Sequence, residues 1–159
     1  MNSIRVSKFD YVIIGAGPAG MAAAITARAH GLSVLVLDEQ PSAGGQIFRN
    51  IESLEATRHS EFIKLGKEYE LGSSLVSRFK KSGADYLSDR SVWQIDKNLQ
   101  IHHVSASASK SNSAISHCQA KRLLIAVGAM ERPMPLPGWT IPGVMPCTAA
   151  DVLHKSSGF

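Results

Sequence analysis

The amino-acid sequence predicts an α/β fold built on a parallel β-sheet. Two runs of apolar residues, 11–14 and 34–37, flank a stretch of small residues with helical character between residues 18 and 30. Such nearly continuous apolar strands are typical of a parallel sheet that is covered on both faces. Further along, short strand-like segments separated by Asp and Asn turns predict an antiparallel meander. We therefore expect a Rossmann-like parallel sheet with helices on both faces and a small antiparallel β-meander insertion.

The turn after the first apolar run carries the pattern Gly-x-Gly-x-x-Gly, formed by Gly15, Gly17 and Gly20. Gly15 can leave the strand in a conformation that a Cβ atom would obstruct. Gly17 lets the backbone approach a pyrophosphate, and Gly20 lets the helix pack tightly on the strand. Pro18 and Ala19 fall in the first helical turn, where free N–H groups and the helix dipole face a phosphate. The pattern predicts a dinucleotide-binding βαβ unit, with a purely structural glycine turn as the alternative.

The second apolar run ends in two adjacent acids, Asp38 and Glu39. Glu39 lies 19 residues after Gly20, about where an acidic side chain accepts hydrogen bonds from a ribose. Successive side chains of a strand point to opposite sides. We therefore expect Asp38 to point away from the cofactor, and Asp38→Ala to cost much less affinity than Glu39→Ala.

A second glycine pair follows the acidic tip. After Glu39 and four further residues come Gly44, Gly45 and Gln46. Together with the βαβ unit, this order resembles the N-terminal FAD-binding part of the two-dinucleotide-domain FAD/NAD(P)-binding oxidoreductases. These are the pyridine nucleotide-disulfide oxidoreductase-like proteins, a broad group that includes thioredoxin reductase. The resemblance implies FAD as the cofactor, and implies that Gln40, Gly45 and Gln46 contact it.

The C-terminal part of the sequence narrows this resemblance. An apolar strand at 122–127 breaks at Gly128 and Ala129 and leads into a proline-rich segment. This stretch is similar to the FAD/NAD-binding subunits of opine oxidases, hydrogen cyanide synthase and related heteromeric amine and amino-acid dehydrogenases. In that family the strand returns the backbone to the flavin, although Val127 stands here where the family has threonine. The resemblance therefore implies cofactor contacts at Gly128, Ala129 and Val92, and partner oxidoreductase subunits.

Between its two ends the chain is less informative. Residues 40–58 have no clear periodicity at their start, whereas apolar positions recur at helical spacing in the next segment, where Gly66 and Gly72 favour a kink or break. Strand-like segments occur at 86–87, 92–95 and 100–102. We therefore expect a βαβ dinucleotide unit (8–50), a helix (58–83), a β-meander with a Ser-rich loop (85–120), and a strand with its Pro-rich return segment (121–145).

Residues 1–159 are expected to form one FAD-binding domain that is incomplete relative to the family. The family continues into a second, NAD-binding βαβ unit and then returns to supply a Gly-Asp contact to the flavin. This sequence has a single Gly-x-Gly-x-x-Gly and no Gly-Asp dipeptide. We therefore expect the NAD-binding domain to be absent, with NAD(P) binding only in that missing domain, and the chain to be the front part of a larger enzyme.

Composition argues against several other functions. The net charge of +4 comes without aromatic residues interleaved among the basic pairs, which disfavours nucleic-acid binding. No apolar run approaches the length of a membrane span and the N-terminus lacks a signal-peptide core, so we expect a cytoplasmic protein without membrane contact. Cys118 and Cys147 have neither CxxC nor metal-ligand spacing, which disfavours disulfide reduction. His102 and His103 alternate across a strand, so we expect no metal there.

These observations favour the FAD-binding portion of a flavin-dependent oxidoreductase that acts on amine or amino-acid type substrates with partner subunits. One alternative is a truncated nucleotide-binding module without catalytic activity of its own. Another is NAD in the single site, because Glu39 suits the ribose of either cofactor and argues only against NADP. We assign no catalytic residue, since in flavoenzymes the cofactor carries the redox chemistry and the protein orients and tunes it.

Overall fold

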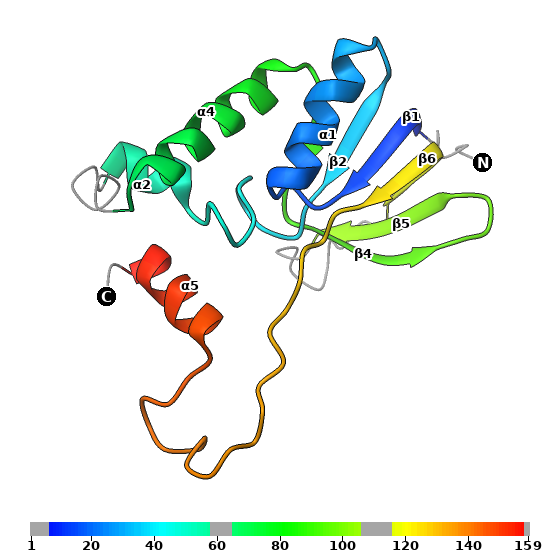
Figure 1. The fold of residues 1–159 in the computed structure, drawn as a ribbon. Coiled ribbons are helices and arrows are strands. Elements are labelled where there is room, and N and C mark those ends of the chain that lie inside the picture. The colour runs from blue at the N-terminus through cyan, green and yellow to red at the C-terminus, as the bar shows by residue number, and fades with distance from the viewer. Residues whose placement is uncertain (1–6, 58–64, 106–115, 158–159) are drawn as a thin grey trace.

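A computed structural model describes residues 7–57, 65–105 and 116–157. Within these residues, strands form one mixed sheet in the order β3-β2-β1-β6-β5-β4 (Figure 1). The strands are β1 (Ser7–Ile14), β2 (Val34–Leu37), β3 (Asp85–Leu87), β4 (Arg90–Ile95), β5 (Gln100–Ser105) and β6 (Ser116–Ile125). Neighbours from β3 to β6 pair in parallel, whereas β4, β5 and the start of β6 pair antiparallel. The α/β class, with a parallel sheet and an antiparallel addition, is confirmed.

The predicted βαβ unit forms as expected. Helix α1 (Pro18–Ala29) follows β1 directly and leads back to β2, which pairs in parallel with β1. Pro18 occupies the first turn of α1, where it does not break a helical hydrogen bond. The helix ends at Gly31, whose φ of 75° lies in the left-handed region that favours glycine.

Strand β3 corrects one assignment made from the sequence. Residues 86–87 were expected to open the antiparallel meander, but Tyr86 pairs with Val36 in a parallel register. The strand therefore extends the parallel sheet, and the antiparallel part begins only at β4. The sequence of a three-residue strand does not show whether it pairs in parallel or antiparallel. The direction depends on the connection that precedes the strand, and here that connection contains helices α2 (Ile51–Thr57) and α4 (Lys67–Lys81).

Strand β6 joins the two parts of the sheet. Its first residues pair antiparallel with β5, and its whole length from Cys118 to Ile125 pairs in parallel with β1. The expected boundary between a meander ending at residue 120 and a strand beginning at 121 is therefore wrong, because one strand spans both. The expected Ser-rich loop falls on residues 106–115, outside the described residues.

The helical segment after β2 also differs from the prediction. Helix α4 (Lys67–Lys81) begins after Gly66, whose φ is 81°, so the expected break occurs there. Gly72 lies inside the continuous helix, and residues 58–64 are outside the described part. Helix α2 (Ile51–Thr57) forms where a loop was expected. Over residues 51–56, where burial is described, Ile51 and Leu54 are the buried side chains, too few apolar positions to reveal a helical period.

The core has two parts, one on each face of the sheet. On one face Ile13, Val34 and Val36 pack against the helices. The helical residues in this cluster include Met21 and Ala24 of α1, Ile51 and Leu54 of α2, and Tyr69, Val76 and Phe79 of α4. On the other face the buried cluster contains Val12, Leu35, Leu37, Ile101, Cys118 and Ala120. Helices were expected on both faces, but in the described residues the buried members of this second cluster all belong to strands β1, β2, β5 and β6.

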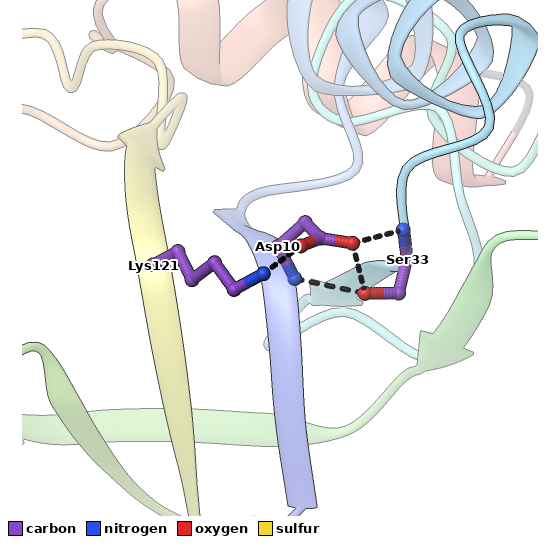
Figure 2. Close-up of polar contacts among 3 residues, drawn as sticks. All are labelled: Asp10, Ser33 and Lys121. Atoms are coloured by element: carbon purple, nitrogen blue, oxygen red, sulfur yellow. Dashed lines mark hydrogen bonds and ion pairs between the residues drawn. The ribbon is translucent and has the colours of Figure 1, made fainter.

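A polar network ties three strands together near the start of the parallel sheet (Figure 2). The Asp10 carboxylate accepts hydrogen bonds from the Ser33 amide at 2.9 Å and the Ser33 hydroxyl at 2.7 Å. Its other oxygen lies 2.7 Å from Lys121 Nζ on β6. Ser33 Oγ also accepts a bond from the Asp10 amide at 2.8 Å. The network therefore links β1 to β6 and to the residue that precedes β2.

After β6 the chain leaves the sheet as a strap, residues 126–146, and then forms α5 (Cys147–Ser157) (Figure 1). Many large apolar side chains of the strap are exposed, including Met130 at 91% and Leu136 at 65%. Helix α5 contacts the loop that follows β2, where Lys155 Nζ lies 3.5 Å from the Gln46 carbonyl oxygen and over the Tyr69 ring. No helix in the described ranges combines the length and the apolar character needed to cross a membrane.

Candidate dinucleotide site

A cavity of about 850 Å³ lies at the carboxyl ends of β1, β2 and β6, beside the first turn of α1. The crevice at this edge of a doubly wound sheet is where such folds bind ligands. The volume falls within the range of roughly 300–1,000 Å³ that is usual for cofactor and ligand sites. Every residue predicted to bind the cofactor lines this cavity except Gly20: the lining includes Gly15, Gly17, Pro18, Ala19, Glu39, Gln40, Gly45, Gln46, Val92, Gly128 and Ala129.

Gly15 and Gly20 bring three elements into close contact. Gly15 has a φ of 104°, and a Cβ atom there would overlap the carbonyl group of Ala126. A Cβ atom on Gly20 would overlap the Gly15 carbonyl oxygen, so α1 sits against the strand end with no room for a side chain. Gly20 therefore has the packing role expected of it, and it lies behind the cavity wall.

The two glycine loops touch each other at the floor of the cavity. The Gly44 amide donates a hydrogen bond of 2.9 Å to the Ala16 carbonyl oxygen. A Cβ atom on Gly45 would lie 2.9 Å from Gly17 Cα. A side chain at Gly45 would fill the space beside the first turn of α1, where Gly17 caps the helix without a side-chain bond. This part of the cavity is therefore lined by backbone, which suits a phosphate group.

The two acids at the end of β2 have different roles. Glu39 is exposed at the cavity, and its Oε1 accepts a hydrogen bond of 3.3 Å from the Ser91 hydroxyl. Asp38 is buried, with one carboxylate oxygen accepting the Ala16 amide and the other accepting the Gln40 amide at 2.7 Å. Asp38 was expected only to point away from the cofactor, and its carboxylate is found to hold the glycine turn against β2.

The wall opposite the glycine turn comes from β4 and the start of the strap. Ser91 and Val92 of β4 line the cavity, as do residues 126–131. Gly128 has a φ of 74° and leads the chain away from the sheet. Val92, Val127 and Met130 make much of this wall apolar. An apolar wall facing a polar backbone floor fits a ligand that has both a planar ring system and phosphates.

Glu131 joins the strap to α5 at the edge of the cavity. Its carboxylate accepts hydrogen bonds from the Thr148 amide, at 3.0 Å, and from the Thr148 hydroxyl. These bonds, with a weaker one from the Cys147 thiol, hold the pKa of Glu131 below its usual value. Glu131 and Thr148 both line the cavity, so α5 forms part of its rim.

Several lining residues were not singled out from the sequence as cofactor contacts. Asp38 was recognised only as the neighbour of Glu39, and Arg49, Arg90 and Thr148 carried no motif. Arg90 and Thr148 are far from the glycine turn in the sequence. The position of β4 in the sheet brings Arg90 to the cavity, and the strap places Thr148 of α5 there. Arg49 stands three residues after Gln46 in the sequence, but nothing there marks it as a cavity residue.

Sequence comparison identifies the family. The pyridine nucleotide-disulphide oxidoreductase family model matches residues 9–157. The chain is 40% identical over 156 residues to an opine oxidase subunit of Agrobacterium tumefaciens (strain Ach5), covering 94% of this chain and 30% of that protein. It is 30% identical over 140 residues to the HcnB subunit of hydrogen cyanide synthase from Pseudomonas protegens, covering 84% and 27%. The chain thus spans about 30% of the length of these relatives.

Solved structures show the same fold at lower sequence identity. L-proline dehydrogenase from P. horikoshii superimposes with a TM-score of 0.58 and 21% identity, covering 84% of this chain and 25% of that one. Thioredoxin reductase from Streptococcus pyogenes MGAS5005 gives a TM-score of 0.53 and 24% identity, covering 83% and 39%. Because the family match runs from β1 to α5 and so includes every wall of the cavity, the chain belongs to the pyridine nucleotide-disulphide oxidoreductase family and has its FAD-binding, Rossmann-like fold.

Proposed function

We propose that the cavity holds FAD and that residues 1–159 are the FAD-binding portion of a flavin-dependent oxidoreductase. The observation that carries this proposal is the convergence of both glycine loops, the tip of β2 and the end of β6 on one cavity of about 850 Å³. A structural glycine turn would need no such cavity. The same arrangement supports a βαβ unit over residues 8–50, and the return segment continues from the end of β6 (Ser116–Ile125).

Each wall suits a different part of the cofactor. The backbone floor at Gly17, Ala19 and Gly45 would receive the pyrophosphate, aided by the N-terminus of α1. Glu39 would accept hydrogen bonds from the adenosine ribose, since its carboxylate is exposed and, among the described residues, accepts one hydrogen bond of 3.3 Å from Ser91. The apolar side chains of Val127 and Met130 would lie against the ring system of the flavin. FAD supplies the redox chemistry when bound, and the residues named here bind it and orient it.

The substrate class and partners follow from the named relatives. These are subunits of an opine oxidase and of hydrogen cyanide synthase, and the alpha chain of sarcosine oxidase from Rhizobium meliloti is 28% identical over 136 residues. We therefore assign amine or amino-acid type substrates and partner oxidoreductase subunits to this protein. We also propose that the protein is located in the cytoplasm.

An absorbance spectrum tests the cofactor assignment. The purified chain is stripped of small molecules, mixed with FAD, passed through a desalting column and scanned in the visible range. Flavin bands that travel with the protein are expected, and their absence would exclude FAD binding by this polypeptide. NAD added at a concentration comparable to that of FAD should not displace the flavin; displacement would identify a NAD site instead.

A second measurement separates an enzyme portion from a nucleotide-binding module. Bound FAD is mixed with NADH or NADPH, with and without the partner subunits, and the bleaching of the flavin band is followed. We expect reduction only in the presence of the partner subunits. Flavin that stays oxidised under all of these conditions would favour a module without activity of its own.

A further inference from the structure

Arg49 lies in the dinucleotide cavity with unused hydrogen-bonding capacity. It lines the cavity between the tip of β2 and the second glycine loop. Its Nη1 donates a long hydrogen bond of 3.2 Å to Gln40 Oε1. Its Nε is buried and has no hydrogen-bond partner among the described residues. A buried N–H without an acceptor is costly, so such a donor calls for a partner that the protein itself does not supply.

The backbone around Arg49 is rigidly held, which fixes where the side chain starts. The Tyr69 hydroxyl donates a hydrogen bond to the Arg49 carbonyl oxygen. The ring of the preceding residue, Phe48, packs edge-to-face on Tyr69 with centroids 5.8 Å apart, and it also fills the space left by Gly72. The Phe48 amide in turn donates to the Gly44 carbonyl oxygen at 3.2 Å. Arg49 is therefore presented to the cavity by α4 and by the glycine loop.

Gln40, which accepts the hydrogen bond from Arg49 Nη1, also has a fixed backbone. The Gln40 amide donates to Asp38 Oδ1 at 2.7 Å, and the Gln40 carbonyl oxygen accepts the Asp89 amide at 3.1 Å. Because the Gln40 side-chain oxygen faces Arg49, its amide nitrogen is turned away from the guanidinium. Arg49 thus holds one of the predicted cofactor residues in a defined orientation.

Charge indicates what the unused donor binds. Among the described residues, the cavity is lined by the carboxylates of Asp38, Glu39 and Glu131 and by the guanidinium groups of Arg49 and Arg90. Arg90 belongs to β4, on the wall opposite the glycine turn. Lys155 Nζ also lies 3.5 Å from the Gln46 carbonyl oxygen, but it is paired with Asp151 at 2.7 Å and is not among the described lining residues. Arg49 is therefore the cavity-lining guanidinium beside the glycine loops, and its planar group matches the oxygens of a phosphate.

We propose that Arg49 is a further cofactor-positioning residue, whose Nε–H donates to a phosphate oxygen of the dinucleotide while its Nη1 holds Gln40. This proposal rests on the proposed function, since it assumes a dinucleotide in the cavity. It adds a side-chain cation to a phosphate site that is otherwise made of backbone N–H groups and the α1 dipole.

The test compares ligands with and without phosphates. The apo-protein is titrated with FAD by flavin fluorescence, and ADP and adenosine are measured as competitors of FAD. Arg49→Met should raise the Kd for FAD and for ADP by about ten- to a hundredfold, the range expected for one charge-assisted hydrogen bond. The inhibition constant of adenosine should change by less than about threefold. Arg78→Met on the exposed face of α4 is the matched control and should leave all three values unchanged.

The possible outcomes separate the two proposals. A wild-type chain that binds neither FAD nor ADP overturns the proposed function and the role of Arg49 with it. A wild-type chain that binds FAD while Arg49→Met binds it equally well overturns only the role of Arg49. An equal loss for adenosine and ADP overturns the phosphate contact, because it shows that Arg49 acts through Gln40 alone. If Arg49→Met does not fold, Arg49→Lys provides the same comparison with a smaller expected loss, because the charge remains and the Nε–H is gone.

Discussion

At the scale of single residues, Glu39 is the side chain on which the cofactor assignment depends most. It is exposed at the cavity and has one hydrogen bond of 3.3 Å, so removing it should leave the fold intact. Glu39→Ala should weaken FAD binding by about one to two decades, the equivalent of roughly 1.5–3 kcal/mol for lost charge-assisted bonds. Titration of the apo-protein with FAD measures the loss. An unchanged Kd would show that the ribose lies elsewhere.

Replacing Asp38 should lower the stability of the fold, because its carboxylate accepts hydrogen bonds from the protein backbone. Asp38→Ala leaves the buried Ala16 and Gln40 amides without their acceptors. An orphaned buried donor costs roughly 1–3 kcal/mol, so the free energy of unfolding should fall by at least that amount. Urea denaturation measures it, with Asp38→Asn as the control that retains one acceptor oxygen. Wild-type stability in Asp38→Ala would contradict the assigned role.

These two acids show how far sequence reasoning reached at the residue scale. Gly15, Gly17 and Glu39 line the cavity at the spacing read from the sequence, because that spacing depends on distances along the chain within one βαβ unit, and their contact with a cofactor stays a prediction. The role of Asp38 was missed because strand alternation predicts only the side to which a side chain points. It does not predict that the glycine turn after β1 lies close enough for the Ala16 amide to donate to Asp38. Arg49 and Arg90 became visible only when separate elements were brought together.

At the scale of elements, Gly72 couples α4 to the cavity. In the sequence it weakens a helix, but in the structure a Cβ atom there would overlap the Phe48 ring. Gly72→Ala should therefore destabilise the protein by about 1–3 kcal/mol, the cost of overpacking, despite the better helix propensity of alanine. Because Phe48 supports the loop from Gly44, FAD affinity should fall as well. Ser74→Ala on the exposed side of α4 is the control, and a stabilised Gly72→Ala would contradict this packing role.

The network at Asp10 makes the attachment of three strands dependent on pH (Figure 2). Hydrogen bonds from Lys121 and then from Ser33 hold the pKa of Asp10 well below its ordinary value of 3.8. A carboxyl with a depressed folded-state pKa stabilises the fold above its unfolded pKa, and this contribution is lost as the pH falls towards the folded-state value. The difference in Tm between the wild type and Asp10→Asn should therefore shrink when the pH is lowered from about 5 to about 2. A constant difference across that range would contradict the pKa shift.

Elements were predicted well where they carry a long or repeated pattern, and poorly where they are short. The apolar runs of β1 and β2 and the small residues of α1 identified the βαβ unit. Strand β3 has three residues and helix α2 has seven, too few to show a period. The sequence therefore assigned β3 to the antiparallel meander and predicted a loop in place of α2. Strand β6 was divided because its polar residues near Lys121 interrupt the apolar pattern, although the hydrogen-bonded ladder continues through them.

At the scale of the whole molecule, the strap is notable for its exposed apolar side chains. Over residues 126–146 it exposes a series of large apolar side chains, among them Met134 at 69% and Trp139 at 51%. Contiguous exposed apolar surface of this kind is uncommon on soluble monomers and marks sites of association. The described residues contain no contact that covers it, and this chain spans about 30% of its relatives' length. We expect the strap to be covered when the chain associates with another protein surface.

The last prediction follows from that exposure. In solution the 159-residue chain should self-associate as its concentration rises, because burying the strap against another copy removes apolar surface from water. The double variant Met134→Ser and Leu136→Ser should shift sedimentation towards the monomer. Its FAD affinity should stay within about twofold of the wild type, a factor worth roughly 0.4 kcal/mol, since neither side chain lines the cavity. Leu71→Ser is the matched control, since Leu71 is 70% exposed on α4, away from the strap, and its removal should not change association. A wild-type chain that remains monomeric at high concentration, or a Leu71→Ser variant that dissociates equally well, would show that the strap is not the association surface.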